Sequence, residues 1–61
     1  MAVSIQEQIA CVVREIGFRE SCYPRWVADR KMSQAKADSE IAAMEAVLAT
    51  LREVEQSRKL L

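Results

Sequence analysis

The sequence has no histidine and only two cysteines, the residue types on which zinc sites depend. A structural zinc site needs four Cys or His ligands at short spacings, which this chain does not contain. It also lacks a glycine-rich phosphate loop and a nucleophile with a histidine base beside it. We therefore expect no catalytic residue, no metal and no cofactor, which points to a protein that is not an enzyme.

The two cysteines are poorly placed to form a disulfide with each other. Cys11 and Cys22 are eleven residues apart. On one helix this spacing corresponds to roughly 16 Å of rise, whereas a disulfide tolerates about 7 Å between Cα atoms. No signal peptide and no apolar run of about 18 residues is present, so we expect a cytoplasmic protein without membrane contact. The thiols then act as small half-buried apolar groups or, alternatively, in an intermolecular or reactive role.

The sequence also lacks an excess of charge of either sign. Nine basic and nine acidic residues cancel. A chain without net charge has no overall field that attracts it to nucleic acid or to an anionic membrane. Binding of that kind would need a local basic patch.

Glycine and proline each occur once, and the remaining composition favours helix almost everywhere. Ser4 followed by Glu7 fits a capping box, in which both side chains satisfy unpaired backbone N–H groups. Ser33 is a candidate N-cap for a second helix. We predict one domain over residues 1–61. Its first helix covers about residues 4–30, a turn covers about 31–33, and the second helix covers about 33–58.

Both predicted helices carry a face of regularly spaced, mainly apolar residues. In the first helix the spacing alternates between four and three residues, the heptad pattern of a helix seam, through Ile5, Ile9, Val12, Ile16, Arg19, Tyr23, Trp26 and Arg30. The inner face of the second helix presents Ala37, Ile41, Met44, Leu48 and Leu51, and Val47 and Val54 are expected to widen it. These matching faces predict an all-α fold, an antiparallel helical hairpin. Because proline lacks an N–H and crowds the preceding turn, we expect the first helix to bend near Pro24.

Arg19 occupies a seam position at which an apolar side chain is expected. A buried guanidinium needs a partner, and antiparallel pairing of the helices brings Glu40 and Glu45 within its reach. A lone polar residue in a seam commonly fixes the register or the oligomeric state. The alternative is that Arg19 extends past the bend into solvent.

A second apolar strip on the first helix lies away from the seam. It consists of Cys11, Phe18 and Cys22, at spacings of seven and four residues. A single hairpin cannot bury Phe18, which is the only phenylalanine of the chain. Gly17 costs about 1 kcal/mol relative to alanine inside a helix, which a close helix contact would justify. We predict that these four residues form an oligomer interface, with two hairpins making a four-helix bundle.

The only tryptophan lies among basic residues near the expected turn, in a group made of Arg25, Trp26, Arg30, Lys31 and Lys36. One interpretation is architectural, with Trp26 enclosed by Ala37 and Ile41. A second is a basic aromatic patch that stacks on a base or holds a phosphate. A third is a protein-docking surface, for which Trp26 would be only partly buried.

Residues 23–53 read YPRWVADRKMSQAKADSEIAAMEAVLATLRE. This stretch resembles small proteins of unknown function encoded by bacteriophages and prophages of proteobacteria, which share a YPR-x-V, K-M-[ST], A-D-x-E-I and M-E-A-V layout. The resemblance covers about half of the chain, implies a bacterial host cytoplasm and implies no activity.

Three functions are compatible with these features. The first is a non-enzymatic protein of phage or prophage type that self-associates and binds a host or phage protein to modulate it. The alternative is a small nucleic-acid- or nucleotide-binding accessory protein that uses the basic and aromatic group at the hairpin tip. A purely structural part in an assembly is a third role that the sequence allows.

Overall fold

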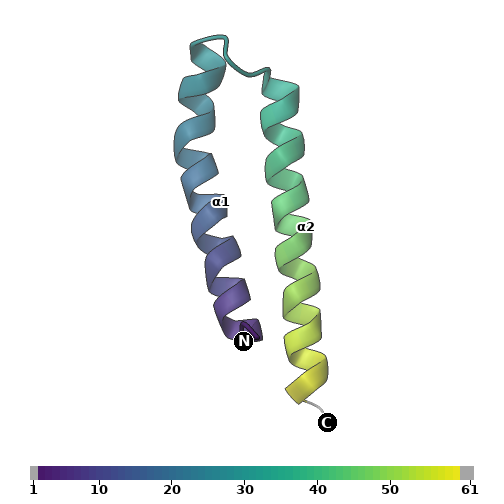
Figure 1. The fold of residues 1–61 in the computed structure, drawn as a ribbon. Helices are drawn as coiled ribbons and strands as arrows, with labels where there is room; N and C mark the ends of the chain where they lie inside the picture. Colours follow the sequence, from purple (N-terminus) through teal and green to yellow (C-terminus); the bar gives the residue numbers. More distant parts are fainter. Residues whose placement is uncertain (1, 60–61) are drawn as a thin grey trace.

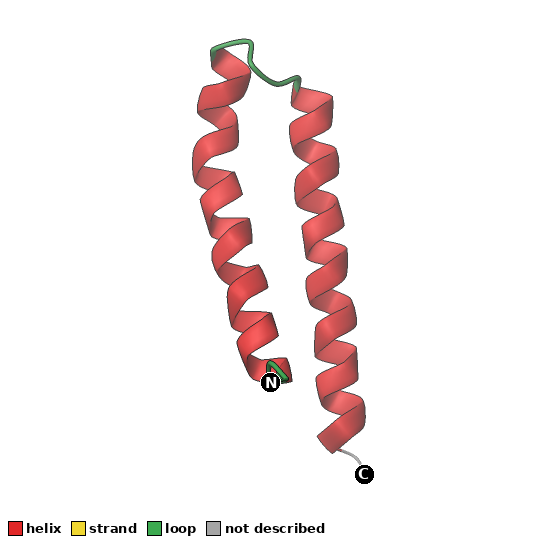
Figure 2. Cartoon of the chain, viewed as in Figure 1, coloured by secondary structure: helices red, strands yellow, loops and turns green. Residues whose placement is uncertain are grey.

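The computed structural model describes residues 2–59, so residues 1, 60 and 61 of the predicted domain lie outside the described part. It consists of two long helices, α1 (Ile5–Ala28) and α2 (Gln34–Lys59), which pack against each other (Figure 1). A short connection at one end joins the helices, and residues 2–59 contain no strand (Figure 2). The predicted all-α helical hairpin is confirmed.

Each helix begins at a serine whose side chain caps it. The Ser4 Oγ accepts a hydrogen bond from the backbone N–H of Glu7 at 3.1 Å. The Ser33 Oγ accepts one from the N–H of Lys36 at 3.0 Å, and its carbonyl accepts one from Ala37, also at 3.0 Å. N–H groups in the first turn of a helix have no partner within the helix, so these caps fix where both helices start.

The end of α1 is closed by two backbone hydrogen bonds. The N–H of Arg30 donates to the carbonyl of Val27 at 3.0 Å, and that of Lys31 donates to Trp26 at 2.9 Å. This is a Schellman motif, in which the residue after the cap adopts a left-handed backbone. Here that residue is Arg30, with φ at 61°. The connection therefore occupies residues 29–33 and is longer than the predicted turn.

Pro24 lies inside α1, which continues through it as one helix along a gently curved path (Figure 1). Proline at this position cannot donate the hydrogen bond that would go to the carbonyl of Glu20. The expected bend is therefore not a break, and no separate helix begins at Pro24.

The hairpin has a thin core and a large surface. The buried apolar residues are Ile5, Ile16, Tyr23 and Ala37, and none of the described side chains is completely enclosed. The radius of gyration is 14.4 Å, whereas a compact domain of this length has about 10.5 Å. The accessible surface is 4744 Å², roughly 700 Å² more than a compact monomer of the same mass exposes. One hairpin therefore exposes more surface than a compact monomer of the same mass, because it is long and thin.

Candidate functional site

Arg19 links the two helices through its guanidinium group. Its Nε donates to Glu15 on the same helix at 2.9 Å, and its Nη1 donates to Glu40 on α2 at 3.4 Å. The Nζ of Lys36 lies 2.8 Å from the other carboxylate oxygen of Glu40. The Arg19 side chain is 23% exposed, so this seam position is partly buried and paired. Its guanidinium does not extend freely into solvent.

The contacts in this cluster favour the charged form of each group. The hydrogen bond to Glu15 is the largest cause that raises the pKa of Arg19. The contact with Lys36 is the largest cause that lowers the pKa of Glu40, and Arg19 adds to it. In return, Glu40 raises the pKa of Lys36. All three groups stay charged near neutral pH, which suits a structural link between helices better than proton transfer.

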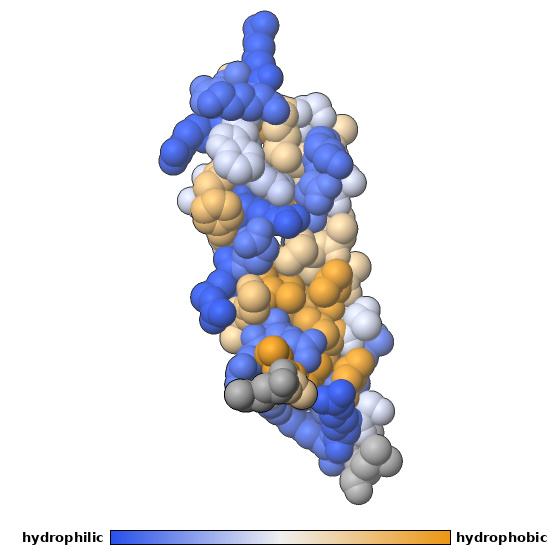
Figure 3. Space-filling model, viewed as in Figure 1, coloured by the Kyte–Doolittle hydropathy of each residue, from blue (hydrophilic) through white to orange (hydrophobic). Residues whose placement is uncertain are grey.

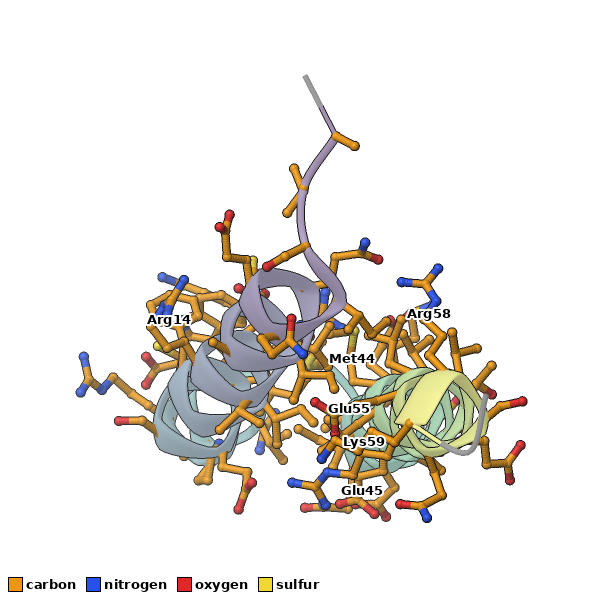
Figure 4. The ribbon with its side chains drawn as sticks, turned by 90° about the horizontal axis from the view of Figure 1, so that it is seen from below. Arg14, Met44, Glu45, Glu55, Arg58 and Lys59 are labelled. Carbon is orange, nitrogen blue, oxygen red and sulfur yellow. The ribbon has the colours of Figure 1, made fainter. Side chains whose placement is uncertain are left out.

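Glu45 does not join this cluster. Its side chain is exposed, and it forms no ion pair with Arg19. Seen along the helices, Met44 points between them, while Glu45 lies to one side of the hairpin and Arg58 to the other (Figure 4). Of the two predicted partners of Arg19, only Glu40 is therefore in place.

The sequence reasoning missed Glu15 as a partner of Arg19. The signal was present, because a carboxylate four residues before an arginine is a standard helix ion-pair spacing. Arg19 therefore gains a partner from each helix.

The strip made of Cys11, Phe18 and Cys22 is not covered by α2. Phe18 is 56% exposed, Cys11 is exposed and Cys22 is half-buried. At about 100° per residue these three positions fall within about 40° of one another around α1. They form an apolar line along one side of the helix, which is interrupted between Cys11 and Phe18 by the exposed Arg14, about 40° from Phe18, and by Glu15, about 60° from it.

The strip continues into an apolar groove between the helices. The groove is lined by Val3, Cys11 and Val12 together with Val47 and Leu51 of α2, and the polar residues Glu7 and Gln8 also border it. Figure 3 shows apolar residues gathered over the lower half of the hairpin. We use the name apolar face for the strip, the groove and the adjoining exposed valine of α2, which together include Val3, Cys11, Phe18, Cys22, Val47 and Val54.

The opposite edge of the helix pair is more polar. A second groove there is lined by Glu20, Gln34 and Asp38 together with Tyr23, Pro24, Val27, Ala37 and Ile41. Glu20 lies about 160° from Phe18 around α1, so the two residues face away from each other. The exposed large apolar residues of the described chain include Val13, which also lies about 140° from Phe18. Of the five exposed large apolar residues of the described chain, four lie on the apolar face and Val13 lies outside it; two of the four, Val47 and Val54, were expected to widen the inner face of the second helix and are exposed instead.

Gly17 was predicted to belong to the oligomer interface. It is exposed, and a Cβ built on it would meet nothing within 4 Å. It lies about 100° from Phe18 around α1, outside the apolar line. Nothing in the packing of the hairpin itself requires a glycine at this position.

The residues predicted to bind a ligand gather at the closed end of the hairpin. Arg25, Arg30, Lys31 and Lys36 are all exposed, and Lys36 is paired with Glu40. Trp26 is half-buried, and the centroid of its ring lies 5.6 Å from that of Tyr23. The tip thus combines exposed cations with an aromatic residue that remains partly accessible.

Tyr23, rather than Trp26, is the buried aromatic residue of the hairpin. It is 8% exposed and lines a groove with Ala37 and Ile41, the two residues expected to enclose Trp26. The heptad pattern assigned both aromatic residues to the seam, but only Tyr23 lies at its centre, about 60° from Trp26 around α1.

Comparisons with protein families, with curated proteins and with solved structures find no match to this chain. Neither α1 nor α2 is long and apolar enough to cross a membrane.

Proposed function

We propose that this chain is a non-enzymatic interaction protein that self-associates through its apolar face and binds a host or phage protein to modulate it. The observation that carries the proposal is the one-sided exposure of four large apolar residues. Val3, Phe18, Val47 and Val54 are exposed by 57%, 56%, 46% and 36%. Contiguous apolar surface of this kind marks protein-interaction sites, because leaving it in water is unfavourable.

The thin core supports the same role. A chain of 61 residues buries only about 60% of the surface that its unfolded form exposes, and small domains of this kind usually need further stabilisation. Association with another polypeptide supplies this stabilisation and requires no chemical reaction at the surface. The resemblance of residues 23–53 to phage and prophage proteins supports a bacterial cytoplasmic setting.

The valines of the hairpin offer a matched pair for testing this proposal. Val47 on the apolar face and Val13 outside it are 46% and 45% exposed, so the same substitution changes nearly the same amount of surface. Tagged protein is used to capture partners from bacterial extract, and each candidate is then purified and titrated by calorimetry. We expect Val47→Ser to weaken self-association and partner binding and Val13→Ser to leave both unchanged. Equal effects of the two variants would contradict the proposal.

A second candidate function is binding of a nucleic acid or nucleotide at the tip. The observation that favours it is the left-handed backbone of Arg30. This conformation costs a non-glycine residue roughly 1–2 kcal/mol. The side chain of Arg30 adds a positive charge to those of the exposed Arg25 and Lys31, and we infer that this charge binds phosphate.

Trp26 is the only tryptophan, so its fluorescence reports directly on the tip. Binding of a single-stranded oligonucleotide should quench this fluorescence, and rising salt should reverse the quenching as counterions compete for the phosphates. The double variant Arg25→Ala/Arg30→Ala should lose the effect. Fluorescence that changes neither with oligonucleotide nor with a free nucleotide would eliminate this candidate.

A further inference from the structure

We infer that a second copy of this chain covers the apolar face, with its α1 antiparallel to the first α1 and with Cys11 of each copy beside Cys22 of the other. The inference rests on the proposed self-association, to which it adds the identity of the partner and the geometry of the contact. Surface area, charge and register each support it.

The surface that one hairpin leaves exposed is of the size that a dimer buries. Each chain exposes 4744 Å², roughly 700 Å² more than a compact monomer of its mass. A stable protein interface buries about 800 Å² on each partner. Contact between two apolar faces would therefore remove an amount of surface close to the excess.

The charges at the two ends of α1 favour the antiparallel arrangement. Glu7 lies in the first turn and Arg25 in the last turn of the helix, and both are exposed. Their separation of eighteen residues is five full turns, so both lie within about 20° of Phe18 around the helix. Antiparallel pairing sets each Glu7 against the Arg25 of the other copy. Parallel pairing would set like charges against each other at both ends.

The charge pairs and the cysteine pairs require the same register. Two identical antiparallel helices are related by a two-fold axis, which lies at the midpoint of each pair of contacting residues. Pairing Glu7 with Arg25 places this axis at residue 16, and pairing Cys11 with Cys22 places it between residues 16 and 17. The two positions differ by less than the rise of one residue, about 1.5 Å. Phe18 then lies within about 3 Å of the axis along α1, so the two phenylalanine rings meet at the centre of the contact.

In this arrangement each cysteine lies close to only one cysteine of the other copy. Cys11 of one copy and Cys22 of the other share the same level along the paired helices. The two copies of Cys22 are separated by roughly 16 Å along the helix direction, beyond the about 7 Å that a disulfide tolerates. The same holds for the two copies of Cys11.

The test is disulfide trapping of the full-length chain with the oxidant diamide. Each disulfide forms when two thiols give up two electrons and two protons, which the N=N bond of diamide takes up. Wild-type protein, Cys11→Ser, Cys22→Ser and an equal mixture of the two variants are oxidised briefly at micromolar concentration. The products are separated on a non-reducing gel.

We expect wild-type protein to give a covalent dimer of twice the 6.9 kDa chain mass. Each single variant should stay monomeric on the gel, because its remaining cysteines are far apart. The mixture should regain the dimer, because Cys22 of one variant then meets Cys11 of the other. Dimers formed by either variant alone, or a mixture that gives none, would overturn the antiparallel arrangement.

Two further measurements separate the possible failures. Circular dichroism shows whether each serine variant remains helical, as expected for substitutions at an exposed and a half-buried residue. Light scattering reports self-association without oxidation. If light scattering shows a dimer but the single variants also cross-link, the proposed self-association is retained and this geometry is rejected. A monomer by both methods would reject the second copy as the occupant and also the self-association in the proposed function. Binding of a host or phage protein, measured separately by calorimetry, would then test the remaining part of that function.

Discussion

The Nη1 of Arg19 lies 3.4 Å from the Oε2 of Glu40 and so connects α1 to α2 across the helix seam. Glu40 is held in turn by Lys36, one turn earlier on its own helix. Sliding one helix past the other would separate Arg19 from Glu40. This is unfavourable, because it takes a partner away from a partly buried charge. The cluster therefore favours one register of the hairpin.

The first prediction concerns the acid sensitivity of this cluster. The pKa of Glu40 is lower in the folded hairpin than its ordinary value of 4.5, so the unfolded chain binds its proton more readily. Its contribution to stability is present above that value and is lost as the pH falls through the lower folded-state pKa. We expect Glu40→Gln to show a smaller loss of melting temperature than wild type between about pH 6 and pH 3.

Thermal melts followed by circular dichroism measure this difference. Glu45→Gln is the matched control, because Glu45 is exposed and outside the cluster. It should reproduce the wild-type pH dependence. Parallel curves for wild type and Glu40→Gln would show that the ion pairs contribute nothing to folding.

Short-range patterns in the sequence predicted much of the fold. Ser4 and Ser33 begin helices because a serine oxygen satisfies nearby N–H groups wherever the following residues are helical. The end of α1 was placed two residues too late. It depends on a left-handed residue that glycine usually signals, and here the residue is Arg30. No local feature of the sequence indicates that an arginine takes this conformation.

The candidate site was predicted less completely than the fold. The heptad spacing placed Tyr23 and Trp26 on one seam but could not decide which of them is buried, because that depends on the angle at which the two helices meet. It did predict that Phe18 lies outside the hairpin core, and its exposed fraction of 56% agrees. The function itself depends on a partner, about which the spacing of residues carries no information.

The second prediction is that Pro24→Ala stabilises the hairpin. The alanine restores a backbone N–H opposite the carbonyl of Glu20 and removes the ring from the preceding turn of α1. Proline inside a helix costs about 3 kcal/mol relative to alanine, so a gain of about 1–3 kcal/mol in the free energy of unfolding is expected. Urea titration at matched protein concentration measures it. An unchanged midpoint would show that the curved path of α1 already accommodates the proline.

The third prediction is that Arg30→Gly stabilises the end of α1. Glycine adopts the left-handed backbone without the side-chain clash, although it also gains freedom in the unfolded chain. The two effects leave an expected net gain of up to about 1 kcal/mol. Arg30→Ala is the matched control, since it removes the charge but retains the strain at φ 61°. Equal stability of the two variants would contradict the assignment of strain to this residue.

The fourth prediction separates the helix propensity of Gly17 from a role in association. A methyl group at this position meets open space in the hairpin, so Gly17→Ala should raise the free energy of unfolding by about 1 kcal/mol. In the antiparallel dimer Gly17 lies about 100° from Phe18, and the dimer dissociation constant should not change. Analytical ultracentrifugation would detect a change. Weaker association of Gly17→Ala would instead place this glycine in the interface.

The last prediction compares the two aromatic residues of the tip. Tyr23 is 8% exposed, so Tyr23→Ala removes a buried ring from a thin core, at a cost on the order of 3–5 kcal/mol. Trp26 is only half-buried and contacts Tyr23 by its ring, so Trp26→Ala should cost clearly less and leave the hairpin folded. Urea titrations of both variants, followed by far-ultraviolet circular dichroism, measure the difference. If Trp26→Ala unfolds the chain as Tyr23→Ala does, the tryptophan is part of the architecture. If the hairpin stays folded while partner or oligonucleotide binding is lost, the accessible part of Trp26 is a binding surface, because its removal then changes recognition without changing the fold.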